Sequence, residues 1–217
     1  MTKEGYPFVI PTAGISLLLF AVWIYHERFV AFLLAVVFLA LSLFVIFFFR
    51  DPGRETPQGK DLILSAADGK VIFIQPFDHL EFLGGGGTMV SVFMSIFDVH
   101  VNRAPISGLV KYFKHNPGRF LPAFKDKASL ENEQTELGLE NGQLRVVVRQ
   151  IAGIIARRIV CRVKPGDTLE SGERFGMIRF GSRVDLFLPQ SVELKVRLHQ
   201  RVTAGETVIG VFQKCET

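Results

Sequence analysis

His100 has the sequence context of an acid–base residue. It follows the apolar stretch 91–97 and the pair Asp98-Val99, and Arg103 comes three residues later. A histidine at the end of a buried strand, with a carboxylate and a guanidinium nearby, can take up and release a proton near neutral pH. A buried structural histidine fits the same pattern, so this context alone leaves both readings open. The remaining histidines lie in turn-like, polar or solvent-facing stretches: His26, His79, His115 and His199.

Two other kinds of chemistry fit the sequence poorly. No metal site is expected, because paired-histidine motifs such as H-x-H and H-E-x-x-H are absent from the sequence. The glycine run 84–87 lacks the Lys-Ser/Thr that completes a phosphate-binding loop. The dipeptide Gly181-Ser182 is uninformative by itself, since a chain with 20 glycines contains such a pair by chance. The residues around this dipeptide are therefore needed to indicate a role for Ser182.

The N-terminal quarter of the chain is far more apolar than the rest. Phe29–Phe49 holds 21 residues without a charge, which at about 1.5 Å per residue match the roughly 30 Å hydrocarbon core of a bilayer. Phe8–Tyr25 is a second apolar run, and a turn of three residues, 26–28, separates the two. We therefore predict a membrane anchor and linker at 1–54, with helices at about 8–25 and 29–49 joined as a hairpin.

The charges around the hairpin predict its orientation. Four basic residues flank the open end, whereas Arg28 is the basic residue of the turn; the four are Lys3, Arg50, Arg54 and Lys60. The positive-inside rule then places both termini and the remaining domain on the cytoplasmic side of the cell membrane. Three alternatives stay open: a hairpin that enters the bilayer without crossing it, a cleaved signal peptide, and a buried helix of a soluble core.

Residues 55–217 have the pattern of a mainly β domain. Short apolar runs are separated by glycine turns, and we expect Asp68-Gly69 to turn a hairpin between the runs on either side. The pattern V-x-x-G-[D/E]-T-[L/V] occurs at 163–169 and again at 202–208. This punctuation is similar to that of lipoyl-type barrel-sandwich domains, although two ordinary hairpins would also produce it.

The segment Ile178–Pro189, which contains Gly181-Ser182, closely resembles the self-cleavage segment of phosphatidylserine decarboxylases, especially their short bacterial and archaeal form. Further stretches resemble the same family in the same order: Ala67–Val71, Phe93–Pro105, Asp126–Glu133 and Gln150–Arg158. Together they extend over most of residues 60–190. Several long, irregular motifs in one order are far more specific than any one of them.

This resemblance implies a self-cleaving, pyruvoyl-dependent carboxy-lyase. The Ser182 hydroxyl would attack the Gly181 carbonyl, a step that glycine favours because it tolerates strain and lets the hydroxyl approach. Cleavage would give a β chain, 1–181, and an α chain, 182–217, held together as a heterodimer, with further oligomerisation left open. A pyruvoyl group derived from Ser182 would form a Schiff base with the amine of phosphatidylserine. Phosphatidylethanolamine and CO2 would be the products.

The resemblance also implies roles for residues around Ser182. An Asp–His–Ser relay would use His100 as the base and Asp68 as the carboxylate that orients it. The chain departs from the long-form enzymes at Arg103, where those carry a second histidine. Either His100 serves both processing and product protonation, or Arg103 holds the carboxylate or phosphate of the lipid. The family-like stretch 126–133 adds two candidates for substrate binding: Asn132 and Glu133.

Three other functions stay open on the sequence. A membrane-anchored adaptor or a lipoyl-like carrier would share the architecture, but the turns at 165–166 and 204–205 lack the exposed lysine that carriers need. A zinc peptidase would need paired histidine ligands. A decarboxylase-like enzyme for another amine-bearing headgroup would differ in a few pocket contacts. The net charge of +4 is too small to indicate nucleic acid, and it suits a protein beside an anionic membrane.

Overall fold

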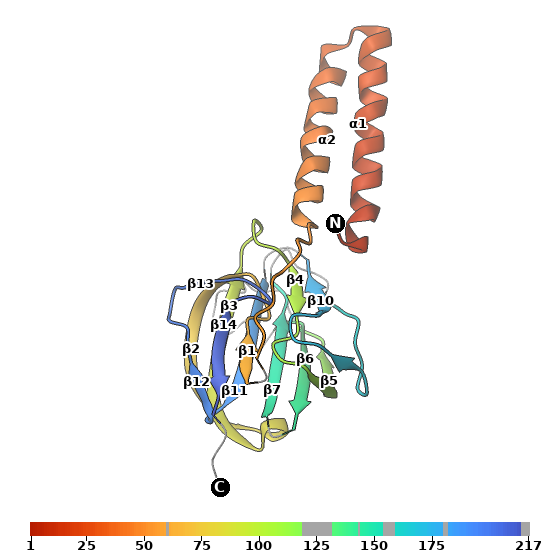
Figure 1. Ribbon diagram of the computed structural model, residues 1–217. Helices are drawn as coiled ribbons and strands as arrows, with labels where there is room; N and C mark the ends of the chain where they lie inside the picture. The colour runs from red at the N-terminus through yellow and green to blue at the C-terminus, as the bar shows by residue number, and fades with distance from the viewer. Residues whose placement is uncertain (60, 119–131, 143, 154–158, 180–181, 214–217) are drawn as a thin grey trace. The chain divides into compact units, whose positions relative to one another are not determined.

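The computed structural model extends over residues 1–217 (Figure 1). It describes all of them except 60, 119–131, 143, 154–158, 180–181 and 214–217. The chain separates into two compact units, Met1–Pro52 and Gly53–Thr217. They are called the helical unit and the β unit below.

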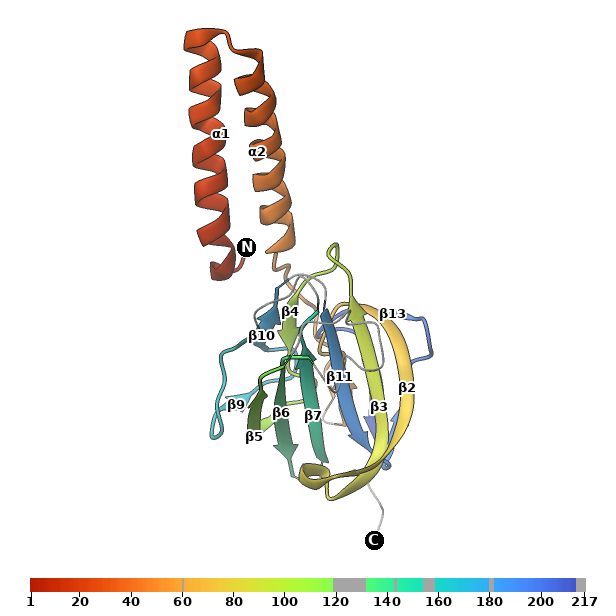
Figure 2. The ribbon, with the colours of Figure 1, turned by 180° about the vertical axis from the view of Figure 1, so that it is seen from behind.

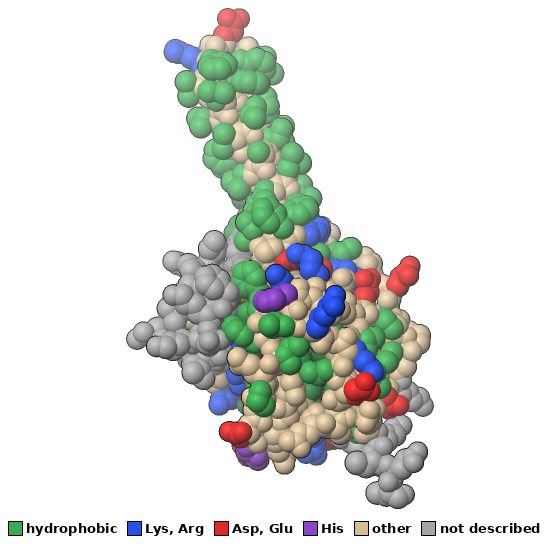
Figure 3. Space-filling model, turned by 90° about the vertical axis from the view of Figure 1, so that its left-hand side faces the viewer, with side chains coloured by type: hydrophobic (Ala, Val, Ile, Leu, Met, Phe, Trp, Pro, Cys, Tyr) green, Lys and Arg blue, Asp and Glu red, His purple; other side chains and the backbone are tan. Residues whose placement is uncertain are grey.

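The helical unit is a pair of long apolar helices. α1 (Tyr6–His26) follows the 3-10 turn η1 (Lys3–Gly5), and α2 (Phe29–Phe48) runs back alongside α1 (Figure 1). Both helices begin and end within two residues of the predicted bounds. Each is long and apolar enough to cross a membrane. Their large hydrophobic side chains cover the surface of this unit (Figure 3), as expected for helices that contact lipid.

Two serines join the helices through hydrogen bonds. The buried Ser16 hydroxyl donates to the Ala35 carbonyl at 2.8 Å, and the hydroxyls of Ser42 and Thr12 lie 2.9 Å apart. Small hydroxyl residues let apolar helices approach closely and satisfy their own polar atoms without water. This is the kind of packing that a helix pair needs inside a bilayer.

The β unit confirms the prediction of a mainly β domain. The structure describes the following strands: β1 (Leu62–Leu64), β2 (Gly69–Leu80), β3 (Gly85–Met94), β4 (Val101–Arg103), β5 (Gly108–Asn116), β6 (Gln134–Asn141), β7 (Leu144–Ile151), β8 (Ile159–Cys161), β9 (Thr168–Leu169), β10 (Arg174–Ile178), β11 (Ser182–Pro189), β12 (Val192–Leu194), β13 (Arg201–Val202) and β14 (Val208–Phe212). A 3-10 turn, η2 (Glu81–Leu83), connects β2 to β3.

Eight of the described strands form one curled sheet, in the order β13-β2-β3-β11-β7-β6-β5-β9 (Figures 1 and 2). Two three-stranded sheets, β1-β14-β12 and β4-β10-β8, complete the part of the unit that the structure describes. All the pairings are antiparallel between strands that are often distant in sequence. The hydrophobic core lies against one face of the curled sheet.

β11 occupies the middle of the curled sheet. All eight of its residues pair with β3, and five of them also pair with β7 on the other side. Val184, Leu186 and Leu188 alternate onto the core face. Arg183 and Asp185 therefore lie on the opposite face. The first residue of this central strand is Ser182.

The two copies of the repeated pattern form equivalent turns. The Asp167 amide donates to the Lys164 carbonyl at 3.1 Å, and at the equivalent positions the Glu206 amide donates to Thr203 at 3.2 Å. The glycine of each turn has a left-handed backbone, with φ of +99° in the first copy and +74° in the second. Each turn leads into a strand, β9 or β14. The sequence repeat is therefore a repeat of local structure.

The predicted hairpin at Asp68-Gly69 is wrong. β1 pairs with β14 and β2 pairs with β3, so the strands on either side of this dipeptide belong to different sheets. Gly69 has φ of +150°, and a Cβ there would lie 2.1 Å from the Phe93 carbonyl oxygen. Glycine is needed because β2 starts in close contact with β3, and not because the chain folds back on β1.

β11 carries a buried ion pair on the face opposite the core. Arg183 Nε lies 2.6 Å from Asp185 Oδ1, and Arg183 Nη2 donates to the Ser91 hydroxyl at 2.9 Å. Both charged side chains are almost fully buried, and the guanidinium carbon lies 4.8 Å from the centre of the Phe73 ring. Buried charges are tolerated when they are paired in this way. The pair thus ties the start of β11 to β3 and β2.

Asp185→Ala is expected to lower the free energy of unfolding by about 3–5 kcal/mol, because it leaves Arg183 buried without its counter-ion. The double variant Arg183→Met/Asp185→Leu should lose much less, since no buried charge remains. The measurement is urea unfolding in detergent micelles, followed by the circular dichroism of the strands. The exposed pair Glu193–Lys195 supplies the control, because Glu193→Gln should leave the midpoint unchanged. An Asp185→Ala midpoint equal to that of the control would contradict the prediction.

Candidate active site

Ser182 is fully buried at the start of the central strand β11. Its backbone pairs with Met94, the last residue of β3. Its hydroxyl donates to the Met94 sulfur at 3.4 Å. A thioether is a weak acceptor, so the hydroxyl is held in place without a strong competing partner. Gly181, the other residue of the predicted cleavage site, lies outside the described residues.

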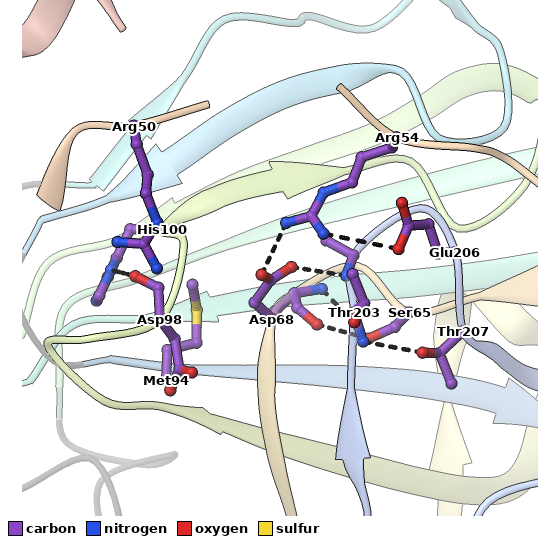
Figure 4. A network of polar contacts seen from close by, with 12 residues as sticks. Arg50, Arg54, Ser65, Asp68, Met94, Asp98, His100, Thr203, Glu206 and Thr207 are labelled. Atoms are coloured by element: carbon purple, nitrogen blue, oxygen red, sulfur yellow. Dashed lines mark hydrogen bonds and ion pairs between the residues drawn. The ribbon is translucent and has the colours of Figure 1, made fainter. Parts of the chain in front are cut away.

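His100 is fully buried and follows a turn that begins where β3 ends. Asp98 Oδ2 accepts from both the amide and the hydroxyl of Ser95, at 2.8 and 2.7 Å, which closes this turn. The Asp98 carbonyl then accepts from His100 Nδ1 at 2.9 Å (Figure 4). A carbonyl can only accept, so the proton lies on Nδ1 and Nε2 is the basic nitrogen of the neutral ring. The turn therefore sets the tautomer of the neutral His100 ring, and its role as a base stays a prediction.

Asp68 binds a different set of groups. Its Oδ2 lies 2.7 Å from Arg54 Nη2, and its Oδ1 accepts from the Ala204 amide at 2.8 Å (Figure 4). Burial raises the pKa of the Asp68 carboxyl, while the Ala204 hydrogen bond and the Arg54 charge oppose the rise. The group that orients the His100 ring is thus the Asp98 carbonyl, and both oxygens of Asp68 are engaged elsewhere. A role for Asp68 in processing stays a prediction.

A chain of buried polar side chains ends beside Ser182. The Thr135 hydroxyl donates to Gln150 Oε1 at 2.7 Å, and Gln150 Nε2 donates to Asn102 Oδ1 at 2.8 Å. These bonds fix the orientation of the Asn102 amide, so its Nδ2 points to the Met94 sulfur at 3.9 Å. Asn102 and Ser182 therefore contact the same sulfur atom. The same Nδ2 also donates to the Ala66 carbonyl at 3.4 Å. Both contacts are long, so the amide can still donate to a better-placed acceptor.

Sequence reasoning did not single out Asn102 or Gln150, although both lie in stretches quoted above. A signal for each was present. Asn102 is two residues after His100, and in an extended segment such residues face the same side. Gln150 is two residues after the core residue Val148, so it is a polar residue at an inward-facing position of β7. Polar residues at inward positions usually have a specific partner.

Arg103 faces away from this cluster. It follows Asn102 in β4, and successive residues of a strand point to opposite sides. Its buried guanidinium donates from Nη1 to the Gly172 carbonyl at 2.9 Å. A contact between Arg103 and the headgroup of a lipid stays a prediction.

Asn132 and Glu133 lie next to the end of β7. Asn132 is buried, and its Nδ2 donates to the Ala152 carbonyl at 2.7 Å. Glu133 Oε1 lies 3.2 Å from His115 Nε2, where the histidine side chain is about half exposed. Asn132 thus supports the backbone that leaves the strand paired with β11, whereas Glu133 lies nearer the surface. Their expected contacts with substrate stay predictions.

The Ser182 hydroxyl and the Asn102 amide contact the same Met94 sulfur, and both side chains are buried. His100 is buried as well, and its Nδ1 is bound by the Asp98 carbonyl. Among the described residues, no group of three or more His, Cys, Asp or Glu side chains is placed to hold a metal ion.

Comparison with known proteins gives consistent matches over most of the chain. Residues 41–210 match the family model described as phosphatidylserine decarboxylase. The chain is 47% identical over 210 residues to the phosphatidylserine decarboxylase proenzyme of Geobacter sulfurreducens, which covers 96% of this chain and 95% of the relative. It is 48% identical over 220 residues to the proenzyme of the same name from Cereibacter sphaeroides, with 100% and 91% covered.

Proposed function

The chain belongs to the phosphatidylserine decarboxylase family, and from this premise we propose that it cleaves itself before Ser182 and then acts as a pyruvoyl-dependent decarboxylase. As a carboxy-lyase of this family it converts phosphatidylserine to phosphatidylethanolamine and CO2. The observation that carries the proposal is the buried Ser182 hydroxyl, which shares the Met94 sulfur with the Asn102 amide.

Self-cleavage begins with the Ser182 hydroxyl, a weak nucleophile that needs a base. In the proposed step, His100 Nε2 takes the hydroxyl proton as Oγ attacks the carbonyl carbon of residue 181. The peptide C–N bond then breaks, the nitrogen takes up a proton, and an ester remains. Loss of the Cα proton breaks the Cβ–Oγ bond and leaves a carboxylate on residue 181. The resulting Cα=Cβ double bond takes up a proton at Cβ while the nitrogen loses one, which gives an imine. Water then adds at Cα and the nitrogen leaves as ammonia, so a ketone remains.

The surroundings of Ser182 fit the group that this reaction would make. The position is fully buried and next to a thioether, and the Asn102 amide can donate to an oxygen there. The pyruvoyl group supplies an electron sink for the bond between Cα and the carboxylate of the substrate. Burial keeps water away from Ser182 and Asn102, which strengthens the action of the amide dipole. His100 carries the proton that the product carbon takes up once CO2 has left.

The two fragments are proposed to remain associated as an α/β heterodimer. Fragment 182–217 would contain β11 to β14, and β11 lies between β3 and β7 of the other fragment. β13 and β14 also pair with strands of that fragment, β2 and β1. A tag on the N-terminus of the large fragment tests this association, because the small fragment should copurify with it. Loss of the small fragment during washing would contradict the heterodimer.

The helical unit suits a phospholipid substrate, because two apolar helices keep an enzyme at the membrane that holds its substrate. We propose that the hairpin crosses the bilayer with the β unit on the cytoplasmic side, on the basis of the basic residues at its open end. A protease added outside intact spheroplasts should leave a C-terminal tag uncut. Cleavage of the tag without lysis would place the β unit outside the cytoplasm and contradict the proposed orientation.

A denaturing gel with intact-mass analysis of the wild-type chain tests the proposed function. It should give a fragment of 1–181 and a 36-residue fragment whose N-terminus resists Edman degradation. Release of CO2 from phosphatidylserine vesicles tests the substrate. A single uncleaved band would favour a non-catalytic membrane adaptor. Complete cleavage without turnover of phosphatidylserine would point to another amine-bearing headgroup.

Asn102→Asp is expected to slow self-cleavage about 10²-fold at pH 8, because it replaces the amide donor with a carboxylate that can only accept. As the pH falls, the carboxyl becomes protonated and can donate again, so the rate relative to wild type should recover. Asn102→Ala is the control, since it lacks a donor at every pH. The rate of band conversion on a gel, measured against wild type at each pH, gives the result. Identical pH profiles for the two variants would contradict a donor role.

A further inference from the structure

Exposed large hydrophobic side chains are distributed very unevenly in this protein. Among the described residues nearly all of them lie in the helical unit, where lipid is expected to cover them. In the described part of the β unit there are two, Phe97 with 64% of its surface exposed and Leu198 with 49%. Single exposed hydrophobic residues are common and mean little. The positions of these two, and the charges around them, are what make them informative.

Phe97 and Leu198 lie on two loops that are tied together. Phe97 is in the turn 95–99 after β3, and Leu198 is in the loop 195–200 before β13. An ion pair between Asp98 and Arg201 joins the two segments. Both loops project from the same end of the curled sheet (Figures 1 and 2).

This end of the sheet is the end that holds the candidate active site. β3 reaches it at Met94, which pairs with Ser182, and β13 pairs with Gly69 and Lys70 at the beginning of β2. The β unit also begins here, because Arg54 contacts Asp68, the residue before β2. The two exposed hydrophobic side chains therefore project beside the site and close to where the chain enters this unit.

The charges around the two loops are mainly basic. Lys70 and Arg197 are exposed, and the Arg201 side chain is 73% exposed although it pairs with Asp98. Asp98 is the acidic residue of the two loops, and its side chain is only 8% exposed. Figure 3 shows Lys and Arg side chains gathered around a histidine among hydrophobic groups on the side where β13 lies. Exposed hydrophobic side chains with basic side chains beside them suit the interface of an anionic bilayer.

We propose that Phe97 and Leu198 insert into the interfacial layer of an anionic bilayer, with Lys70, Arg197 and Arg201 against the lipid headgroups. The inference rests on the proposed function, because a substrate with two acyl chains in the bilayer reaches Ser182 most directly if this end faces the lipid. A hairpin on a linker holds the β unit near the membrane but does not set its orientation. The second contact supplies that orientation.

The test uses the full chain in nanodiscs of phosphatidylcholine and phosphatidylglycerol. Trp23 is the one tryptophan of the chain, so Trp23→Phe with Phe97→Trp leaves a single reporter. Interfacial side chains reach about 5–10 Å into the boundary of headgroups and acyl chains, so acyl-brominated lipid should reduce the emission about two-fold or more. The matched control is His79→Trp, an exposed position near the far end of β2. Its emission should not change.

Leu198→Trp provides a second, independent reporter and should behave like Phe97→Trp. Equal emission with and without bromine at both positions would overturn the proposal. A blue-shifted emission that bromine does not quench would also overturn it, because protein and not lipid would then cover the surface. All reporters also carry Ser182→Ala, so the result does not depend on catalysis. Failure of the proposed function would appear separately, as a wild-type chain that releases no CO2 from phosphatidylserine.

Discussion

Replacing Ser182 with alanine is expected to leave a single uncleaved polypeptide of 217 residues that releases no CO2 from phosphatidylserine. Without the hydroxyl no ester can form, and without the ester the Cβ–Oγ elimination that makes the ketone has no substrate. The loss should reach the detection limit in both assays, since one group supplies both the nucleophile and the later electron sink. Gel mobility, intact mass and CO2 release measure the two effects on the same sample.

The control for this variant is another fully buried serine of the β unit. Ser65 donates to the Ala67 carbonyl at 2.7 Å, so Ser65→Ala removes a buried hydroxyl of the same kind. It should still be cleaved. Complete fragmentation of Ser182→Ala at the same bond would disprove the assignment of the nucleophile. Failure of both variants to cleave would show that the assay reports folding and not chemistry.

His100→Ala is expected to slow self-cleavage by about 10²–10⁴-fold, the usual contribution of a positioned general base. The Asp98 carbonyl holds Nδ1, so the whole basic function of the ring rests on Nε2. The measurement is conversion of the full-length band to fragments over time, beginning from freshly synthesised chain. His115→Ala is the control, because the His115 side chain is about half exposed and pairs with Glu133.

Normal cleavage of His100→Ala would show that the base lies elsewhere in the chain. Arg103 is a poor substitute, because an arginine keeps its proton at any ordinary pH. Slow cleavage in His115→Ala as well would show that the effect is general and not specific to the site.

The sequence predicted the parts of this fold that depend on composition and alternation. The helices at Tyr6–His26 and Phe29–Phe48 follow from long uncharged runs, and the strand-rich β unit follows from short alternating ones. Pairing of distant strands was not predictable in this way. Asp68-Gly69 has the residues of a hairpin turn, yet the strands on either side belong to different sheets. β1 pairs with the distant strand β14 and not with β2.

In the candidate site, too, local sequence patterns were predictable and contacts between distant strands were not. Ser182 and His100 are candidates from the sequence because each lies in a distinctive stretch of it. The polar chain was not predictable, because Asn102, Gln150 and Thr135 come from three strands that only the folded sheet brings together. The partner of His100 was also hidden, since it is a backbone carbonyl, which every residue has. Side-chain types alone could suggest Asp68 for that role but could not show that Arg54 and Ala204 bind it.

The central position of β11 should make refolding after the proposed cleavage different from refolding before it. Before cleavage the protein can unfold and refold as one molecule, like any single chain. After the proposed cleavage its middle strand would belong to a separate 36-residue peptide, which after unfolding would have to find its partner again by diffusion. Renaturation of the mature enzyme should therefore depend on concentration, whereas that of the uncleaved Ser182→Ala chain should not. After a brief heat treatment of a dilute sample, the cleaved enzyme should therefore regain less activity than a concentrated sample does.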